Sequence, residues 1–137
     1  MGFTSGSGRV VVDTSIWISF FNRPASIEKQ ALDDLLDRDD VVLVGIVLTE
    51  LLQGVRSKTE REVLHELFSA LPYLEMTFQT WLSAGDLSSF VRQKGKTLGF
   101  PDLLIAALAL QHSCSVYSLD HDFRQIPGLS LYTPPTA

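Results

Sequence analysis

Short apolar runs alternate with helical patterns along this chain, and the alternation constrains its fold more than any other feature. The first run, residues 9–12, is rich in β-branched side chains and is typical of a strand buried on both faces. Comparable runs at 41–44 and 115–119 are separated from it by segments with apolar residues at i, i+3 and i+4. Because strands that alternate with helices form parallel sheets, the sequence predicts a three-layer α/β/α sandwich with a mainly parallel central sheet.

Periodicity and helix breakers place the individual elements. Pro24 and Pro72 each end a helical pattern, and Gly85 weakens the middle of a long one. The segment 101–112 is apolar on all sides after its first residues, which predicts a buried helix. We expect strands at 9–12, 41–44, 73–76, 115–119 and 129–132, and helices at 14–22, 25–38, 46–55, 58–71, 77–98 and 101–112.

Length and composition limit the class of protein. A chain of 137 residues that is 45% hydrophobic is typical of one domain with its own core. We expect residues 9–137 to form that domain, and residues 1–8, rich in Gly and Ser, to be an added expression tag or a loose tail. A single cysteine, Cys114, excludes an internal disulfide. Neither a membrane helix nor a signal peptide is evident, so we expect a cytoplasmic protein.

Charge argues against a protein that coats nucleic acid, since sixteen acidic residues face only eleven basic ones and the net charge is −5. Much of the acidic excess falls on the outer face of the predicted helix 25–38 and just beyond it. We interpret these acids as solvated charges. They are Asp33, Asp34, Asp37, Asp39 and Asp40.

Four other acids are embedded in apolar sequence, where an isolated carboxylate is costly. Asp13 and Asp120 each follow a predicted strand, Asp102 opens the apolar helix, and Glu50 lies between two apolar pairs. Each has a simpler interpretation: Asp13 and Asp120 as helix caps, Asp102 as a first-turn acid, and Glu50 as an exposed helical residue. Since the carboxyl ends of parallel strands meet at one edge of the sheet, we instead expect the acids to converge.

A cluster of carboxylates needs cations to balance its charge. Hard oxygen ligands, without paired histidines or cysteines, suit Mg²⁺ or Mn²⁺ rather than zinc. Such a site can activate water and stabilise both oxygens of an in-line displacement at a phosphodiester. The cluster therefore predicts nuclease chemistry.

At these residues the sequence resembles the PIN domain family and, within it, the VapC-type toxins of toxin–antitoxin pairs. Four segments in order carry the resemblance, which extends from about Arg9 to Thr133. They are Val12-Asp13-Thr14-Ser15, Thr49-Glu50-Leu51-Leu52-Gln53-Gly54, Pro101-Asp102-Leu103-Leu104-Ile105-Ala106-Ala107 and Ser118-Leu119-Asp120-His121-Asp122-Phe123. The resemblance implies a parallel-sheet sandwich and metal-dependent endoribonuclease activity.

The resemblance also assigns roles to residues. The catalytic acids implied are Asp13, Glu50, Asp102 and Asp120. The metal ligands implied are Asp13, Asp102, Asp120 and, as an auxiliary acid, Asp122. Thr14 and Ser15 support the site, although both can also cap the first helix. One departure is His121, where the family often has Arg or Lys.

Partners follow from the same resemblance. Candidates for contacts with RNA phosphates, which can equally be solvated charges, are Arg56, Lys58, Arg61, Arg92, Lys94 and Lys96. The resemblance implies a VapB-like antitoxin whose arginine-bearing tail blocks the acidic site. Trp17, Phe20 and Phe21 on the first helix can flank a groove for an amphipathic helix, but their spacing also suits core residues, and we expect at least one of the three to be internal. The resemblance also implies a homodimer, for which the apolar residues of 77–98 provide a face.

Other classes of protein fit less well. An aspartate-based phosphatase usually has a second Asp two residues after the first, where this chain has Ser15. A phosphotransfer receiver would carry adjacent acids at its first strand end and a late lysine after a strand, and neither is found. A catalytically inactive PIN-like binding module would have lost one or more of the four acids, and all four are present.

Overall fold

A four-stranded parallel sheet forms the centre of the protein in the computed structural model, which describes residues 8–135. The strand order is β3-β2-β1-β4, and all three pairings are parallel. The strands are β1 (Val10–Val12), β2 (Val41–Val44), β3 (Tyr73–Leu74) and β4 (Ser115–Tyr117). The expectation for residues 1–8 concerns residues that, apart from Gly8, lie outside the described range.

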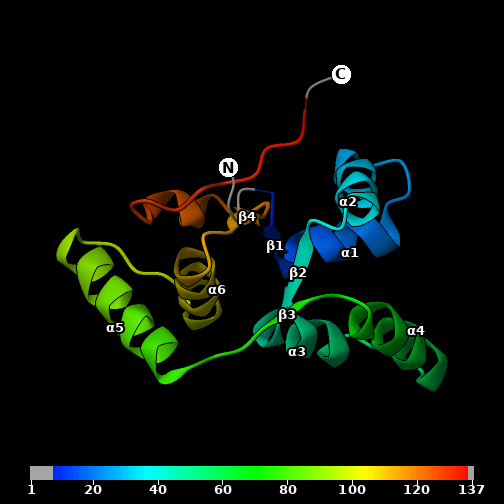
Figure 1. Ribbon diagram of the computed structural model, residues 1–137, viewed down its shortest axis with the longest axis horizontal. Helices are drawn as coiled ribbons and strands as arrows, with labels where there is room; N and C mark the ends of the chain where they lie inside the picture. Colours follow the sequence, from blue (N-terminus) through cyan, green and yellow to red (C-terminus); the bar gives the residue numbers. More distant parts are fainter. Residues whose placement is uncertain (1–7, 136–137) are drawn as a thin grey trace.

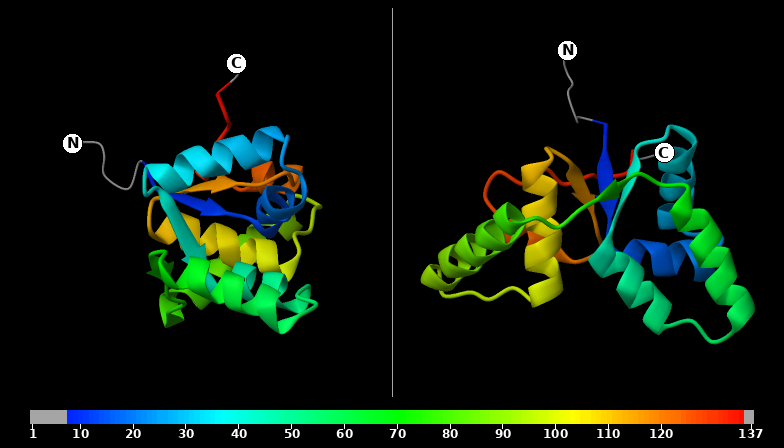
Figure 2. Two further views of the ribbon diagram at one scale, coloured as in Figure 1. Left: turned by 90° about the vertical axis from the view of Figure 1, so that its right-hand side faces the viewer. Right: turned by 60° about the horizontal axis from the view of Figure 1, so that its bottom comes forward.

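Among residues 8–135, six α-helices and one short 3₁₀ helix surround this sheet (Figure 1). Their bounds are α1 (Thr14–Asn22), α2 (Ile27–Asp37), α3 (Gly45–Gln53), α4 (Lys58–Ser69), α5 (Phe78–Gln93), α6 (Phe100–Gln111) and η1 (His121–Gln125). Figure 2 (left) shows α2 on one side of the strands and α6 on the other. The expected three-layer α/β/α sandwich is therefore confirmed.

Burial follows the apolar runs of the sequence. Every residue of β1 and β2 is buried, as expected for central strands covered on both faces. Helix α6 buries seven consecutive residues from Leu103 to Ala109, and the alanines among them permit close packing. Side chains on α1 and α2 complete the core, among them Trp17 and Leu32. The core thus fixes the strand ends from which the acids project.

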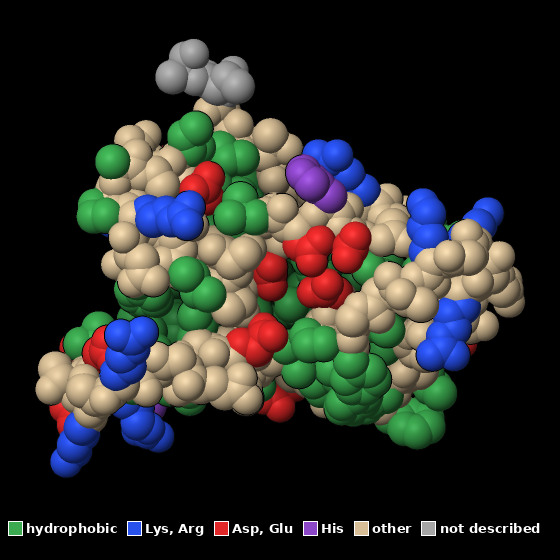
Figure 3. All heavy atoms as spheres, turned by 180° about the vertical axis from the view of Figure 1, so that it is seen from behind, with side chains coloured by type: hydrophobic (Ala, Val, Ile, Leu, Met, Phe, Trp, Pro, Cys, Tyr) green, Lys and Arg blue, Asp and Glu red, His purple; other side chains and the backbone are tan. Residues whose placement is uncertain are grey.

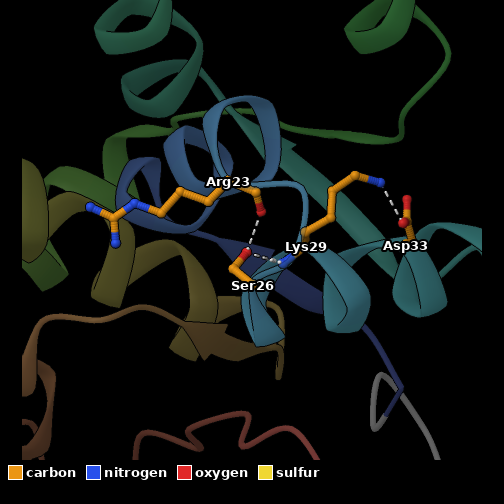
Figure 4. A network of polar contacts seen from close by, with 4 residues as sticks. All are labelled: Arg23, Ser26, Lys29 and Asp33. Carbon is orange, nitrogen blue, oxygen red and sulfur yellow. Dashed lines mark hydrogen bonds and ion pairs between the residues drawn. The ribbon is translucent and has the colours of Figure 1, made fainter.

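The first turn of α2 shows how a local sequence signal sets a helix boundary (Figure 4). Ser26 is the N-cap: its hydroxyl accepts a hydrogen bond from the Lys29 backbone N–H at 3.1 Å and donates one to the Arg23 carbonyl at 2.8 Å. One turn later Lys29 forms an ion pair with Asp33. The helix therefore begins at Ile27 rather than at Ala25 as predicted, and the Ile27 side chain is 64% exposed.

Several other predicted elements are shorter in the structure, among them the strands predicted at 73–76 and 115–119, which end at Leu74 and Tyr117. The helix predicted over 77–98 ends at Gln93, because Gly95 adopts a φ of 77° and the chain turns back on itself. The edge strand predicted at 129–132 is wrong as an element, since only an isolated bridge joins Leu131 to Val116. Within residues 8–135, no helix is long and apolar enough to cross a membrane.

Candidate active site at the strand ends

Asp13 is the buried member of the acidic site. It follows β1 directly and is only 7% exposed. Its Oδ2 accepts hydrogen bonds from the Ser118 hydroxyl at 2.6 Å and the Ser15 hydroxyl at 3.1 Å. Asp13 occupies the N-cap position of α1, as the simpler interpretation held, but its side chain makes no capping hydrogen bond to the helix. Two hydroxyl groups instead fix the carboxylate at the end of the strand.

Ser118 is a residue of the site that the sequence motifs did not single out. Its oxygen donates to Asp13 and also accepts from the Asp120 backbone N–H at 2.9 Å, so it joins the ends of β1 and β4. Ser15 makes a parallel link, because its oxygen accepts from the Leu119 backbone N–H at 3.1 Å. The signal available in the sequence was the position of Ser118 directly after the buried strand β4, two residues before Asp120.

Glu50 lies on α3, the helix that follows β2. Its Oε1 accepts a hydrogen bond from the Thr14 hydroxyl at 2.7 Å, and both side chains are partly buried. Thr14 therefore orients Glu50 just as Ser15 orients Asp13, which fits the supporting role expected for both hydroxyl residues. The simpler interpretation of Glu50 as an exposed helical residue is wrong, because its side chain is partly buried.

The remaining three acids form the closest group. Oxygen atoms of Asp102, Asp120 and Asp122 all lie within 4.8 Å of one another. Asp102 comes from the first turn of α6, and Asp120 and Asp122 from the beginning of η1. Asp120 does act as a cap, since its Oδ1 accepts from the Asp122 backbone N–H at 2.9 Å. Capping and membership of the cluster are therefore compatible.

The pKa of Asp102 shows that all five acids share one electrostatic environment. Burial is the largest cause of its rise from an ordinary 3.8 to about 6. The other causes are the negative charges of Asp120, Asp13, Asp122 and Glu50, in that order. A cation bound among these oxygens would relieve that repulsion. The donor set of carboxylate oxygens fits a hard divalent ion such as Mg²⁺ or Mn²⁺.

On the face shown in Figure 3, acidic side chains gather at the centre, and Lys and Arg side chains lie toward the edges. The predicted RNA contacts are all exposed, but the structure separates them. Arg56, Lys58 and Arg61 lie at or next to the start of α4, whereas Lys94 and Lys96 lie at the end of α5. Arg92 lines a cavity of about 630 Å³ between α5 and α6.

A groove of about 410 Å³ lies between α1, α3 and α4 beside the acidic site. Phe21, which is 40% exposed, lines it together with Ile18, Val63 and Glu50. Trp17 is 1% exposed and packs its ring on Phe20, Phe21 and Phe68. Of the three aromatic residues expected to flank a groove, Trp17 is therefore a core residue, and Phe21 is the one that lines the surface.

These features define a class: a parallel-sheet α/β/α protein with a carboxylate site beyond the carboxyl ends of its strands. A family model described as the PIN domain matches residues 10–129. The chain belongs to the PIN domain family.

Its relatives within this family are VapC ribonucleases. Ribonuclease VapC1 of Rickettsia felis is 30% identical over 135 residues, which cover 90% of this chain and 95% of that protein. Ribonuclease VapC11 of Mycobacterium tuberculosis is 27% identical over 125 residues, which cover 88% and 93%. Among solved structures, VapBC2 from Rickettsia felis bound to a promoter DNA fragment superimposes with a TM-score of 0.76 and 25% identity, covering 90% of this chain and 96% of that one.

Proposed function

We propose that this protein is a metal-dependent endoribonuclease that acts in the cytoplasm as the toxin of a toxin–antitoxin pair. The observation that carries the proposal is the convergence of five acids, from the ends of β1 and β4 and from α3, α6 and η1, on one electrostatic site. Relatives that are named ribonucleases and align over nearly their full length support the nuclease activity. The full set of acids speaks against a binding-only module.

The metal we propose is Mg²⁺ or Mn²⁺, held by Asp102, Asp120 and Asp122 with Asp13 beside them. When bound, such an ion activates water and stabilises the charge that develops on a phosphodiester during displacement. The residues of this chain set the geometry. Ser118 and Ser15 fix the Asp13 carboxylate, and Thr14 fixes Glu50. These hydroxyls keep the acids in place before substrate arrives.

The decisive experiment is metal-dependent cleavage of total RNA, followed by mapping of the cut sites. We expect cleavage with Mg²⁺ or Mn²⁺, none in the presence of a chelator, and no phosphatase activity on small phosphate esters. Cleavage that survives complete metal removal would contradict the proposal.

Metal-free protein should become more stable when Asp102 is replaced by asparagine. Because the folded state raises the pKa of Asp102 to about 6, it binds this proton more tightly than the unfolded chain does. The stability that the proton provides is therefore lost as pH rises from about 4 to about 6. Since Asp102 is only partly buried, we discount the full shift and expect Asp102→Asn to gain about 1–2 kcal/mol above pH 6.

Urea unfolding with a chelator present, at several pH values between 4 and 8, measures this gain. The difference between variant and wild type should grow from pH 4 to pH 6 and stay constant above it. An Asp102→Asn protein that is less stable than wild type at pH 7.5 would show that the acids do not repel one another in the folded state.

We also expect a homodimer, in which α5 forms the contact. Its first half exposes three large apolar side chains: Phe78 at 79%, Trp81 at 49% and Leu82 at 48%. Phe100, at the start of α6, stacks on Trp81 and is 64% exposed. Light scattering should give twice the 15.2 kDa chain mass, and Phe78→Lys with Leu82→Lys should give a monomer. A wild-type monomer at all concentrations would refute this.

A further inference from the structure

A positively charged pocket lies next to the acidic site. It has a volume of about 360 Å³ and is lined chiefly by Phe90, Val91, Lys94, Lys96, Arg124 and Gln125. No acidic side chain among residues 8–135 lines it. The ion pairs found in that part of the chain use Lys29 and Arg38, so the three cations of the pocket have no anionic partner there. In a protein with a net charge of −5, this concentration of positive charge is a local exception.

The end of α5 builds one wall of the pocket. The Gly95 N–H donates to the Arg92 carbonyl at 2.9 Å, and the Lys96 N–H donates to the Val91 carbonyl at 3.1 Å. This pair of bonds, with a φ of 77° at Gly95, is a Schellman motif that folds the chain back over the last turn. The motif places Lys94 and Lys96 on the same pocket, although a straight helix would separate them.

The short helix η1 builds the opposite wall and connects the pocket to the acids. Asp122, a member of the carboxylate cluster, and Arg124, a cation of the pocket, are two residues apart on η1. The Gln125 side-chain N–H donates to Asp122 Oδ1 at 3.3 Å. A chain molecule that passes the carboxylates can therefore reach the pocket without leaving the surface of η1.

The lining matches the chemistry of a single-stranded polynucleotide. Lys94, Lys96 and Arg124 provide charge for a phosphate. Phe90 is 39% exposed, and Lys94 Nζ lies 5.3 Å from the centroid of its ring. Aromatic rings of this kind stack on bases with little sequence preference.

We propose that this pocket is a substrate subsite, which binds a phosphate of single-stranded RNA beside the cleavage site while Phe90 stacks on the adjoining base. The inference rests on the proposed ribonuclease function and identifies where the substrate is held outside the carboxylate centre. Long RNA then gains binding energy that a dinucleotide, confined to the carboxylates, does not.

The test compares two double variants that remove the same charge. Lys94→Gln with Lys96→Gln alters the pocket. Arg9→Gln with Arg38→Gln alters the opposite edge of the sheet, since these residues precede the amino ends of β1 and β2. We expect the pocket variant to reduce the preference for a long RNA over a dinucleotide, as a ratio of kcat/KM values, by about tenfold. The control variant should keep the wild-type ratio.

Measurements of RNA binding test the proposed subsite independently of the proposed ribonuclease function. In an Asp102→Asn background, the slope of log Kd against log salt should fall by about 0.7 for each phosphate that the pocket variant no longer neutralises. If wild type cuts no RNA but the pocket variant still binds RNA more weakly, the proposed function is wrong and the subsite stands. If both double variants bind and cut RNA alike, or if the pocket variant changes only antitoxin binding, the subsite is overturned.

Discussion

Asp102→Asn should reduce RNA cleavage by about 100-fold or more without loss of fold. Asp102 is the acid on which the other four act electrostatically, and its oxygen lies within 4.8 Å of oxygens of Asp120 and Asp122. An amide of the same shape keeps the packing of α6 but removes one charge from the metal site. Asp13→Asn and Asp120→Asn should have effects of similar size, and Asp122→Asn a smaller one.

The measurement is the initial rate of cleavage of a defined RNA at saturating Mg²⁺ or Mn²⁺. Asp37→Asn is the matched control. Asp37 is an exposed acid at the end of α2, and it does not line the groove, the cavity between α5 and α6 or the positively charged pocket. It should cleave at the wild-type rate. An Asp102→Asn protein with wild-type metal-dependent activity would contradict a shared carboxylate site. Circular dichroism of each variant separates loss of chemistry from loss of fold.

Replacing a hydroxyl residue that orients the acids should reduce cleavage less than replacing an acid does. Ser118 touches both Asp13 and the backbone of Asp120, so its removal leaves the charges of the site unchanged and disturbs only their positions. Residues that hold metal ligands in place in this way typically alter metal affinity or activity by about 10–100-fold when they are replaced. The cleavage rate of Ser118→Ala should therefore lie between the rates of Asp37→Asn and Asp102→Asn. A higher metal concentration should restore part of the lost activity.

Much of the acidic site could be predicted from the sequence, because the order of strands and helices brings Asp13 and Asp120 to the same edge of the sheet. Asp13 follows the β-branched run of β1, and Asp120 follows the apolar segment of β4. Both segments are typical of buried strands, and the carboxyl ends of parallel strands share one edge of the sheet. The apolar pattern of the helix that Asp102 opens was enough to identify Asp102 as a candidate. These predictions depend on the period of hydrophobic residues, which is a local property that the fold preserves.

The parts that sequence reasoning missed depend on contacts between distant residues. Ser118 bonds to Asp13 across 105 positions of the chain, and its place directly after β4 does not by itself reveal that contact. Arg124 joins Lys94 and Lys96 only because η1 and the Schellman turn of Gly95 face one another. The strand expected at 129–132 is reduced to a single parallel bridge, where Ser130 and Tyr132 form backbone hydrogen bonds with Val116 of β4.

Inhibition by a cognate antitoxin should depend on two separate contacts with this chain. The groove between α1, α3 and α4 exposes Ile18 at 48% and Val63 at 55%, and it extends to Glu50 of the acidic site. An amphipathic helix can cover such apolar side chains. A basic side chain following it can then lie among the carboxylates, where it takes the place of a cation. We expect the groove to provide most of the binding affinity for the antitoxin, and the basic side chain to inhibit cleavage.

We therefore expect the antitoxin to inhibit cleavage in proportion to its binding, and less so at high salt, because the opposite charges attract more weakly when screened. Replacing the tail arginine by alanine should restore cleavage while the complex persists. On this chain, Ile18→Asp with Val63→Asp should weaken inhibition about tenfold or more. Ile27→Asp, at a side chain that is 64% exposed on α2 and outside the groove, should not. If the antitoxin with alanine in place of the tail arginine still inhibits fully, inhibition does not act through the site of Asp13, Glu50, Asp102 and Asp120.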